Sequence, residues 1–461
     1  MRSCEAWLII VVLSLLVVVP AFGFRYTAVI DYPPLEYQPS GMVVDDSGHI
    51  WFAMPQGRAV ALYVPGVGVN LIDVEARVSD LAYGHGVVVA YEAGSSDVVF
   101  IDAASGRVLS KSVESGYVDA IVPVDGGFVL VKNFPTMTML VHVSPGGEIL
   151  WESKISDKQL ERYRPAAGSG KYVWLRTVEG NLLLIELGRE GYKEYRLEKK
   201  PIVLASRDGK VWAVDSEGGV TRLSIRGVEA RLNTGSKVML GDPCFALPGD
   251  RLVILSRIDG VVTEISDGQA SREALQNSFT LAALKGVAEV YMADASEKSI
   301  LVASFSRQPT IYDASATPVG DGGVIRVTAR VSDPDGDLAE GYPRVVGVLG
   351  TDTSIQQMSL VGDVYSADLA VPKSEGVLKV YVQAMDAGGN EARLEVASYQ
   401  VSGGRVTGVG PATATPPPSQ GTSNLSSLFP FAVEMTFFII LVTVLVVVWL
   451  GRSRRGRRRR R

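Results

Sequence analysis

Histidine, serine and cysteine are the residues that could act as acids, bases or nucleophiles near neutral pH. The chain has three histidines, His49, His85 and His142, and no two are placed like metal ligands or like an acid–base pair. No Gly-x-Ser-x-Gly elbow stands between a strand and a helix. Cys244 follows a proline at the start of an apolar stretch, where a small buried residue is more typical than a nucleophile. The sequence therefore predicts no catalytic residue, although it leaves catalysis open.

Carboxylates gather in two segments further along the chain. Asp333, Asp335 and Asp337 alternate through Asp-Pro-Asp-Gly-Asp, and Asp386 lies in a second turn. Closely spaced carboxylates suit a hard cation such as Ca²⁺, which prefers oxygen ligands. The spacing is not that of an EF-hand, because the glutamate at loop position 12 is missing. The same residues also form a good turn with no ion, so calcium is one of two alternatives, and no other cofactor is expected.

Strands must position these residues. At Gly41–Ala53 an apolar strand runs into an Asp-Ser-Gly turn, and a second strand begins with Ile-Trp-Phe. A turn glycine can supply the positive φ that such a hairpin needs. The turn glycines recur every 37 to 43 residues, as Gly48, Gly86, Gly127, Gly170, Gly209, Gly249 and Gly286. Seven units with room for four short strands each predict a seven-bladed β-propeller over residues 24–310. The strand Tyr26–Ile30 is expected to complete the last blade and close the ring.

The repeat also predicts details within the blades. Trp51, Trp174 and Trp212 follow turn glycines at similar distances, so they are expected at equivalent buried positions. Two polar stretches, Asp157–Arg164 and Ser271–Asn277, interrupt the pattern. They are expected to be short helical or loop insertions between blades.

The motif Gly-x-x-x-Asp-x-x-Gly-x-Ile-Trp-Phe at residues 41–52 resembles streptogramin lyase and the NHL/YVTN-type propellers. The resemblance covers about 285 residues and implies the propeller fold rather than an activity. The lyases use histidine in a central funnel. This chain departs from them because its histidines fall in turns on the opposite face or within a strand. The lyase reaction is therefore not expected.

The wide face of a propeller is lined by the loops after the second strand of each blade. A ring of mixed charge there could bind a polar or anionic ligand, although exposed loops are commonly polar without any ligand. The candidate funnel residues are Arg58, Glu92, Lys132, Arg176, Asp215, Arg257 and Asp294.

Residues 311–402 change from the propeller rhythm to strict alternation. Ile325, Val327 and Ala329 alternate with polar residues, and the stretch 378–385 does the same. Half-buried strands at this spacing predict a β-sandwich. The turns at 331–337 and 384–390 resemble those of immunoglobulin-like or fibronectin-III-like modules.

Targeting signals occupy both ends of the chain. Residues 1–23 combine a basic start, an apolar core and a small-x-small site, which predicts a signal peptide; an uncleaved anchor is the alternative. Residues 403–428 are rich in Pro, Thr, Ser and Gly and predict an extended linker. Residues 429–450 predict a transmembrane helix. The tail at 451–461 holds eight arginines, so the positive-inside rule places it in the cytoplasm.

Charge separates the folded body from this tail. Without the eight arginines, Arg2, Glu5 and Glu434, the chain has 36 basic and 48 acidic residues. An acidic body argues against nucleic-acid binding by the folded domains, while an arginine tail that binds nucleic acid stays an alternative. Cys244 is alone in the mature body, so no intrachain disulfide can form.

These features together predict a single-pass protein of the cell membrane with its folded domains outside. Its partners would be the membrane and an extracellular ligand or envelope protein. The predicted function is recognition or scaffolding at the cell envelope. The alternative is an extracytoplasmic lyase or hydrolase that acts on a glycan or small molecule in the funnel.

Overall fold

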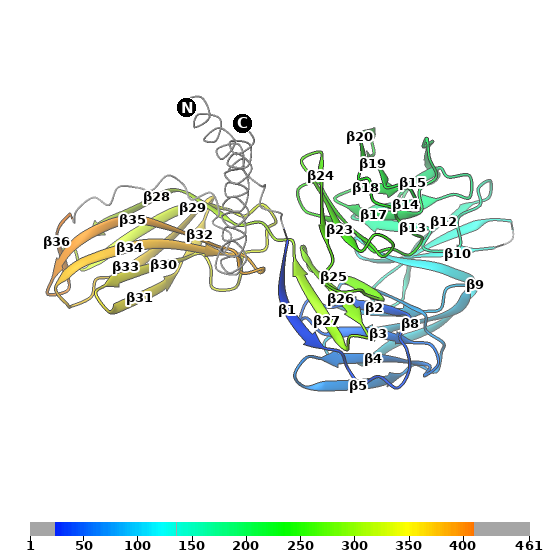
Figure 1. The fold of residues 1–461 in the computed structure, drawn as a ribbon, viewed down its shortest axis with the longest axis horizontal. Coiled ribbons are helices and arrows are strands. Elements are labelled where there is room, and N and C mark those ends of the chain that lie inside the picture. The colour runs from blue at the N-terminus through cyan, green and yellow to red at the C-terminus, as the bar shows by residue number, and fades with distance from the viewer. Residues whose placement is uncertain (1–23, 135, 410–461) are drawn as a thin grey trace, which may run out of the picture. The chain divides into compact units, whose positions relative to one another are not determined.

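Every regular element in the described part of the chain is a β-strand (Figure 1). In this computed structural model the described residues are 24–134 and 136–409. The predicted signal peptide, transmembrane helix and arginine tail lie outside them, as does most of the predicted linker. Within the described ranges there is no helix long and apolar enough to cross a membrane.

Residues 25–304 form seven antiparallel blades (Figure 1). In four of them the strands follow chain order across a separate sheet. Blade one consists of β2 (Gly41–Val44), β3 (Ile50–Met54), β4 (Ala59–Val64) and β5 (Gly68–Asp73). Blade four consists of β13 (Ala166–Ser169), β14 (Tyr172–Arg176), β15 (Leu182–Glu186) and β16 (Lys193–Tyr195). Blade five consists of β17 (Val203–Arg207), β18 (Lys210–Val214), β19 (Gly219–Ser224) and β20 (Gly227–Asn233). Blade six consists of β21 (Cys244–Leu247), β22 (Arg251–Ser256), β23 (Val261–Ser266) and β24 (Gln269–Ala274).

Blades two and three share one long strand, β9 (Val108–Val124). Its first half is the outer strand of blade two, which also contains β6 (Asp80–Gly84), β7 (Val87–Tyr91) and β8 (Ser95–Asp102). Its second half is the inner strand of blade three, which continues with β10 (Gly127–Asn133), β11 (Thr138–Val143) and β12 (Ile149–Ile155). The chain thus passes between these two blades without a loop.

The first strand of the chain closes the ring. Blade seven contains β25 (Leu281–Lys285), β26 (Glu289–Asp294) and β27 (Ser299–Ser304). Its outer strand is β1 (Arg25–Asp31), which pairs antiparallel with β27 (Figure 1). The predicted closure is therefore confirmed, and the outer edge of β27 is covered.

Seven hydrophobic clusters, one between each two neighbouring blades, form the core of the propeller. The cluster between blades seven and one joins Phe52 to Ile300 and Val302, so the ring of clusters is complete. Trp51, Trp174 and Trp212 are at most 3% exposed, and each packs into the core shared with the following blade. Their predicted equivalence is confirmed.

Asp45 explains why the repeat motif has an aspartate before its turn. Its carboxylate accepts hydrogen bonds from the backbone N–H of His49 at 3.0 Å and from the indole N–H of Trp51 at 3.0 Å. One buried side chain thus fixes the turn and orients the tryptophan that enters the core. Gly41 allows the close approach of the next blade, because a Cβ there would lie 3.0 Å from the Cα of Asp80.

One polar stretch was predicted correctly and the other was not. Asp157–Arg164 is a loop between blades three and four, with a single bridge from Leu160 to Thr177. Ser271–Asn277 was expected to be an insertion, but its first four residues belong to β24, the outer strand of blade six. An outer strand is exposed on both faces, so its sequence lacks the apolar alternation that identifies other strands.

The second part of the described chain is a two-sheet β-sandwich. One sheet contains, in spatial order, β28 (Thr310–Val319), β29 (Val324–Ser332), β33 (Val364–Ala370) and β32 (Ser359–Val361). The other contains β31 (Asp352–Gln357), β30 (Arg344–Leu349), β34 (Gly376–Met385), β35 (Glu391–Ser402) and β36 (Arg405–Val409). Ile325 and Val327 from one sheet and Val380 and Val382 from the other share a buried core, as the alternation predicts. The strand β36 falls within the range predicted as linker, because residues 403–404 form a glycine turn that leads into it.

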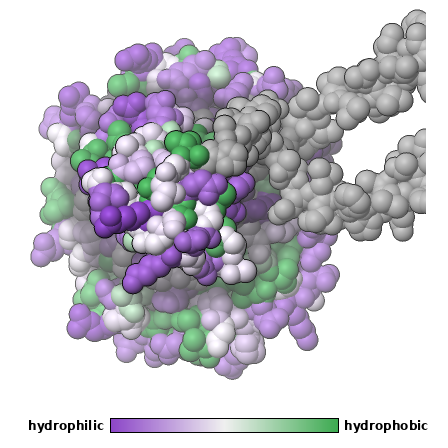
Figure 2. All heavy atoms as spheres, turned by 90° about the vertical axis from the view of Figure 1, so that its left-hand side faces the viewer, coloured by the Kyte–Doolittle hydropathy of each residue, from purple (hydrophilic) through white to green (hydrophobic). Residues whose placement is uncertain are grey.

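The surface of the sandwich carries a few exposed apolar side chains on its edge strands. Ile355 is 56% exposed on β31, and Leu360 and Val361 are 57% and 69% exposed on β32. Figure 2, which views the molecule from the left-hand side of Figure 1, shows hydrophobic patches interspersed with hydrophilic ones. Scattered exposure of this kind is ordinary for a protein surface.

Replacing Asp45 should destabilise the propeller. Asp45→Ala leaves the buried N–H of Trp51 without its acceptor, which we expect to lower the free energy of unfolding by about 2–3 kcal/mol. Denaturant unfolding followed by tryptophan fluorescence measures the change. Glu190→Ala, at an exposed position, is the control and should stay within about 0.5 kcal/mol of wild type. Equal stability of the two variants would contradict this role of Asp45.

Candidate functional sites on the propeller and at its junction with the sandwich

The predicted funnel residues lie where the second strand of each blade ends, and burial divides them into two groups. Four are at most 8% exposed, namely Lys132, Arg176, Asp215 and Asp294. Arg58 and Arg257 are exposed and Glu92 is partly exposed. Arg176, Asp215 and Asp294 are hydrogen-bonded within the protein, which gives them a structural role, and the second group is more accessible to a ligand. Ligand binding by all seven residues stays a prediction.

Arg176 has a structural role within the propeller. Its guanidinium donates to the carbonyl oxygens of Pro201 at 3.1 Å, Ile202 at 2.6 Å and Tyr163 at 2.7 Å. Burial lowers the pKa of this side chain. The three carbonyls belong to the loops that lead into blades four and five, so Arg176 holds these two loops together.

Asp215 and Asp294 close the turns that follow them. Asp215 accepts from the backbone N–H groups of Glu217 and Gly219 at 2.8 and 2.9 Å. Asp294 accepts from the backbone N–H and the hydroxyl of Ser296 at 2.8 and 2.6 Å. Burial alone would raise the pKa of Asp294, but these hydrogen bonds and one from Ser278 together hold it below its usual value.

The seven inner strands surround a central channel with a volume of about 430 Å³. Its walls are mostly alanine, valine, leucine and isoleucine. None of the three histidines lines it in the described structure. His49 pairs with Asp45 at 3.1 Å, His85 contacts the carbonyl oxygen of Val124 at 2.6 Å, and burial lowers the pKa of His142 in β11.

One end of this channel has a polar rim that the sequence reasoning missed. Asp80 and Asp242 stand at or just before the start of inner strands and line the channel. Arg164 lies 3.4 Å from Asp80, and Arg257 donates to Asp242 at 3.1 Å. Burial, and then the charge of Asp80, raise the pKa of Tyr91, whose hydroxyl donates to Asp80. An aspartate at or just before the start of an inner strand, as in blades two and six, is the signal that could have located this rim. The arrangement suits a ligand with a polar end and an apolar body.

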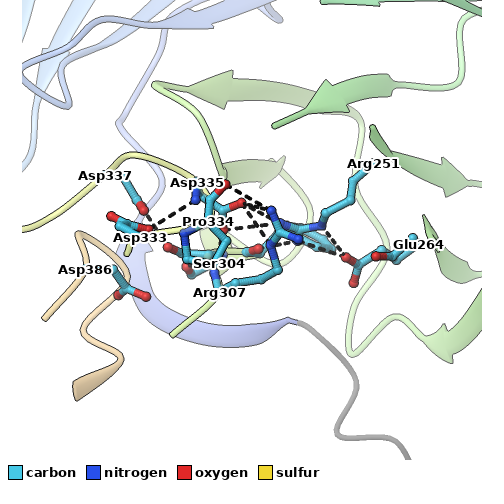
Figure 3. Close-up of polar contacts among 12 residues, drawn as sticks. Arg251, Glu264, Ser304, Arg307, Asp333, Pro334, Asp335, Asp337 and Asp386 are labelled. Atoms are coloured by element: carbon cyan, nitrogen blue, oxygen red, sulfur yellow. Dashed lines mark hydrogen bonds and ion pairs between the residues drawn. The ribbon is translucent and has the colours of Figure 1, made fainter. Parts of the chain in front are cut away.

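The predicted calcium ligands lie at the junction between the propeller and the sandwich (Figure 3). The two aspartate turns are adjacent, because Leu338 bridges to Asp386 and Ala387 donates to the carbonyl oxygen of Asp337 at 2.7 Å. The two turns therefore lie at the same end of the sandwich. Asp386 is fully buried and accepts from Asn390 at 2.7 Å.

Asp335 is engaged by two arginines of the propeller side (Figure 3). Arg251, in the second strand of blade six, is fully buried and lies 3.1 Å from the Asp335 carboxylate. Arg307 donates to the same carboxylate from its backbone N–H at 2.6 Å and from its guanidinium at 2.9 and 3.0 Å. Arg251 also pairs with Glu264 at 2.8 Å. This network joins blade six, the segment after β27 and the sandwich.

The role of Asp335 as a calcium ligand is therefore corrected. Both of its oxygens are used by arginines, and a cation would have to displace two positive charges. No group of three or more His, Cys, Asp or Glu in the described ranges is arranged to hold a metal ion. One carboxylate oxygen of Asp333 and one of Asp337 are buried with no hydrogen-bond partner in the structure. Calcium binding by Asp333, Asp337 and Asp386 stays a prediction.

Protonation, like calcium binding, would reduce the negative charge of this cluster of aspartates. Burial raises the pKa of Asp337 to about 6, and the charges of Asp333, Asp386 and Asp335 contribute, while a hydrogen bond from Ser306 acts in the opposite direction. Burial likewise raises the pKa of Asp386. Burial thus disfavours the ionised form of both carboxylates, and repulsion from neighbouring carboxylates adds to this at Asp337.

Comparisons with known proteins give structural likeness only. No family model and no curated protein matches the chain. A streptogramin B lyase structure aligns with a TM-score of 0.48 at 13% identity, over 61% of this chain and 97% of that chain. A catalytically inactive virginiamycin B lyase from Staphylococcus aureus with quinupristin aligns with a TM-score of 0.48 at 12% identity, over 61% and 99%. The Neurospora crassa Pan2 WD40 domain aligns with a TM-score of 0.47 at 11% identity, over 62% of this chain and 96% of that chain. At this level of similarity the propeller assignment depends on the strand pairing and the closed ring of cores described above.

Breaking the buried charge network should lower the free energy of unfolding. Asp335→Ala leaves Arg251 buried beside a single carboxylate, and we expect a loss of about 3–5 kcal/mol in the free energy of unfolding. Asp363→Ala removes an exposed aspartate that pairs with Arg330, and should cost at most about 1 kcal/mol. Thermal and denaturant unfolding of the full chain compare the two. Similar losses would show that burial of the network adds nothing to stability.

The raised pKa of Asp337 predicts a pH dependence with a definite sign. In the unfolded chain Asp337 loses its proton near its ordinary pKa of 3.8, and in the folded chain only near 6. The folded state binds more protons in this window, so stability falls as the pH rises through it. Asp337→Asn should therefore be more stable than wild type at pH 7, and the difference should vanish below about pH 4.

Melting curves from pH 4 to 7 make this measurement, with Asp363→Asn as the exposed control. A difference between Asp337→Asn and wild type that does not change with pH would contradict the prediction. The same curves with millimolar calcium at pH 7 test calcium binding, which requires a rise in the wild-type midpoint that Asp337→Asn lacks.

Proposed function

We propose that the protein is a membrane-anchored recognition or scaffolding protein whose propeller and sandwich face the outside of the cell. The observation that carries this proposal is the closed seven-bladed ring, which presents the turns and loops between its strands at fixed positions. Rigid scaffolds that display loops are the usual basis of binding surfaces. The mixed charge of Arg58, Glu92 and Arg257 on one face suits a polar ligand or protein partner.

The sandwich would act as a rigid extension of the propeller in this proposal. Asp335 ties it to Arg251 and Arg307, so the two would move as one body. We assign it to the immunoglobulin-like sandwiches. The order β28-β29-β33-β32 in one sheet and β31-β30-β34-β35 in the other supports this, since it corresponds to the order ABED and C′CFG.

The membrane anchor rests on the sequence of the two ends. The apolar segment 429–450 is followed by eight arginines, and residues 1–23 have the pattern of a secretory signal. The linker that precedes the apolar segment would separate the folded domains from the membrane. The alternative of an enzyme in the channel is not favoured, because the channel walls are mostly aliphatic.

Protease treatment of intact cells that produce the protein tests this proposal. A protease added outside should release the propeller and sandwich and leave a small arginine-rich fragment protected. Antibodies against the propeller and against a C-terminal tag follow the two products on a gel. Detergent-permeabilised cells are the control, in which the tag is lost as well. A propeller that stays intact until the cells are permeabilised would refute the proposed orientation.

A further inference from the structure

A large groove lies off the axis of the propeller, beside blades three and four. Its volume is about 1050 Å³, just above the range for small-molecule sites, which is roughly 300–1,000 Å³. It is bounded by β9, by Phe134, Thr136 and Met137 between β10 and β11, and by the loop 156–163. Tyr163 lines both this groove and the central channel, so the loop separates the two.

Asp119 is placed in this groove by a β-bulge. In the pairing of β9 with β10, Val131 lies opposite Ala120 but Lys132 lies opposite Val118, so Asp119 is an extra residue in the ladder. Bulges redirect side chains and are common beside binding and catalytic sites. Asp119 is only 8% exposed, yet it lines the groove.

A short hydrogen-bond chain holds the Asp119 carboxylate in place. The amide N–H of Asn133 donates to Asp119, and the hydroxyl of Thr138 donates to the amide oxygen of Asn133 at 2.6 Å. Thr138 is 1% exposed, and both residues line the groove as well. Burial raises the pKa of Asp119. A carboxylate that lies in a cleft although burial disfavours its ionised form is typical of a functional site.

Aromatic rings form the other part of the groove. Tyr117 is 61% exposed and Tyr163 is 44% exposed, although both are large side chains that proteins usually cover. Tyr117 precedes Asp119 by two residues on the same strand, and Tyr163 comes from the loop that forms the far wall. The groove thus combines apolar ring faces with a fixed hydrogen-bond acceptor.

Three of the six charged groups in the lining are paired with residues outside it. Lys158 pairs with Glu194 at 2.9 Å, and Glu161 pairs with Lys200. Asp157 accepts from the hydroxyl of Tyr192. Arg162 and Glu179, which are both exposed, also line the groove and carry opposite charges. These walls favour an uncharged ligand that donates hydrogen bonds.

We propose that this groove binds a neutral oligosaccharide. Sugar hydroxyls would donate to Asp119 and exchange hydrogen bonds with Asn133, and the C–H faces of the sugar rings would pack on Tyr117 and Tyr163. A hydrogen bond to an ionised carboxylate is stronger than one between neutral groups. The volume suits several linked rings rather than one. This inference rests on the proposed role in recognition and names the class of ligand.

The test uses the full chain, purified in a detergent that has no sugar headgroup. The probes are oligomers of glucose, mannose, galactose and N-acetylglucosamine on an array, followed by titration calorimetry with those that bind. We expect Tyr117→Ala and Asp119→Asn each to weaken binding at least tenfold. Tyr312→Ala, on an exposed tyrosine of the sandwich, and Asp208→Asn, on an exposed aspartate in a turn of blade five, are matched controls and should bind like wild type.

Thermal unfolding of each variant separates loss of binding from loss of fold. Because Tyr117 is exposed, Tyr117→Ala should melt like wild type, which keeps the test valid even if Asp119→Asn is unstable. Failure of all the oligomers to bind at millimolar concentration would overturn the proposal, as would binding that both variants retain. Binding of spermidine instead of sugars would replace it with a cation site. The surface orientation is tested separately by proteolysis, so either idea can fail alone.

Discussion

Burial of apolar surface between neighbouring blades is the interaction on which the described propeller depends. Each blade has two apolar faces, so an open row of blades would expose one face at each end. Closure removes both ends, because β1 joins blade seven and that blade then packs Phe52 of blade one against Ile300. The burial of one such aromatic side chain contributes on the order of 2 kcal/mol. The loop rims, the groove and the junction all take their geometry from this ring.

The repeat was predictable from sequence because its signals are local. A turn glycine, the aspartate that closes the turn and the tryptophan that follows lie within a few residues, as Asp45, Gly48 and Trp51 do. Outer strands gave no such signal. The side chains of residues 271–274 face water on both sides of the strand, so nothing in their composition distinguishes this segment from a loop. Exposure to water also explains why β36, at the edge of the sandwich, was not predicted from the sequence.

The candidate sites were harder to predict, since they depend on contacts between distant segments. The spacing of Asp333, Asp335 and Asp337 showed that negative charge is concentrated there. It could not show that Arg251, 84 residues earlier in the chain, is buried against the central carboxylate. Arg176 was placed correctly at the end of its strand, but its burial under three carbonyls depends on neighbouring loops. Asp119 was missed because a bulge depends on strand register, which composition does not report.

The pairing of β1 with β27 has a consequence for the order of synthesis. Arg25–Asp31 leaves the ribosome before the rest of the propeller, whereas its partner Ser299–Ser304 follows about 270 residues later. At a translation rate of about 5–20 residues per second, this strand waits on the order of tens of seconds without its neighbour. Blades one to six can form during that time, but the last inter-blade core cannot. An unpaired edge strand is prone to pair with another chain, so the nascent propeller would benefit most from a chaperone just before its final blade is complete.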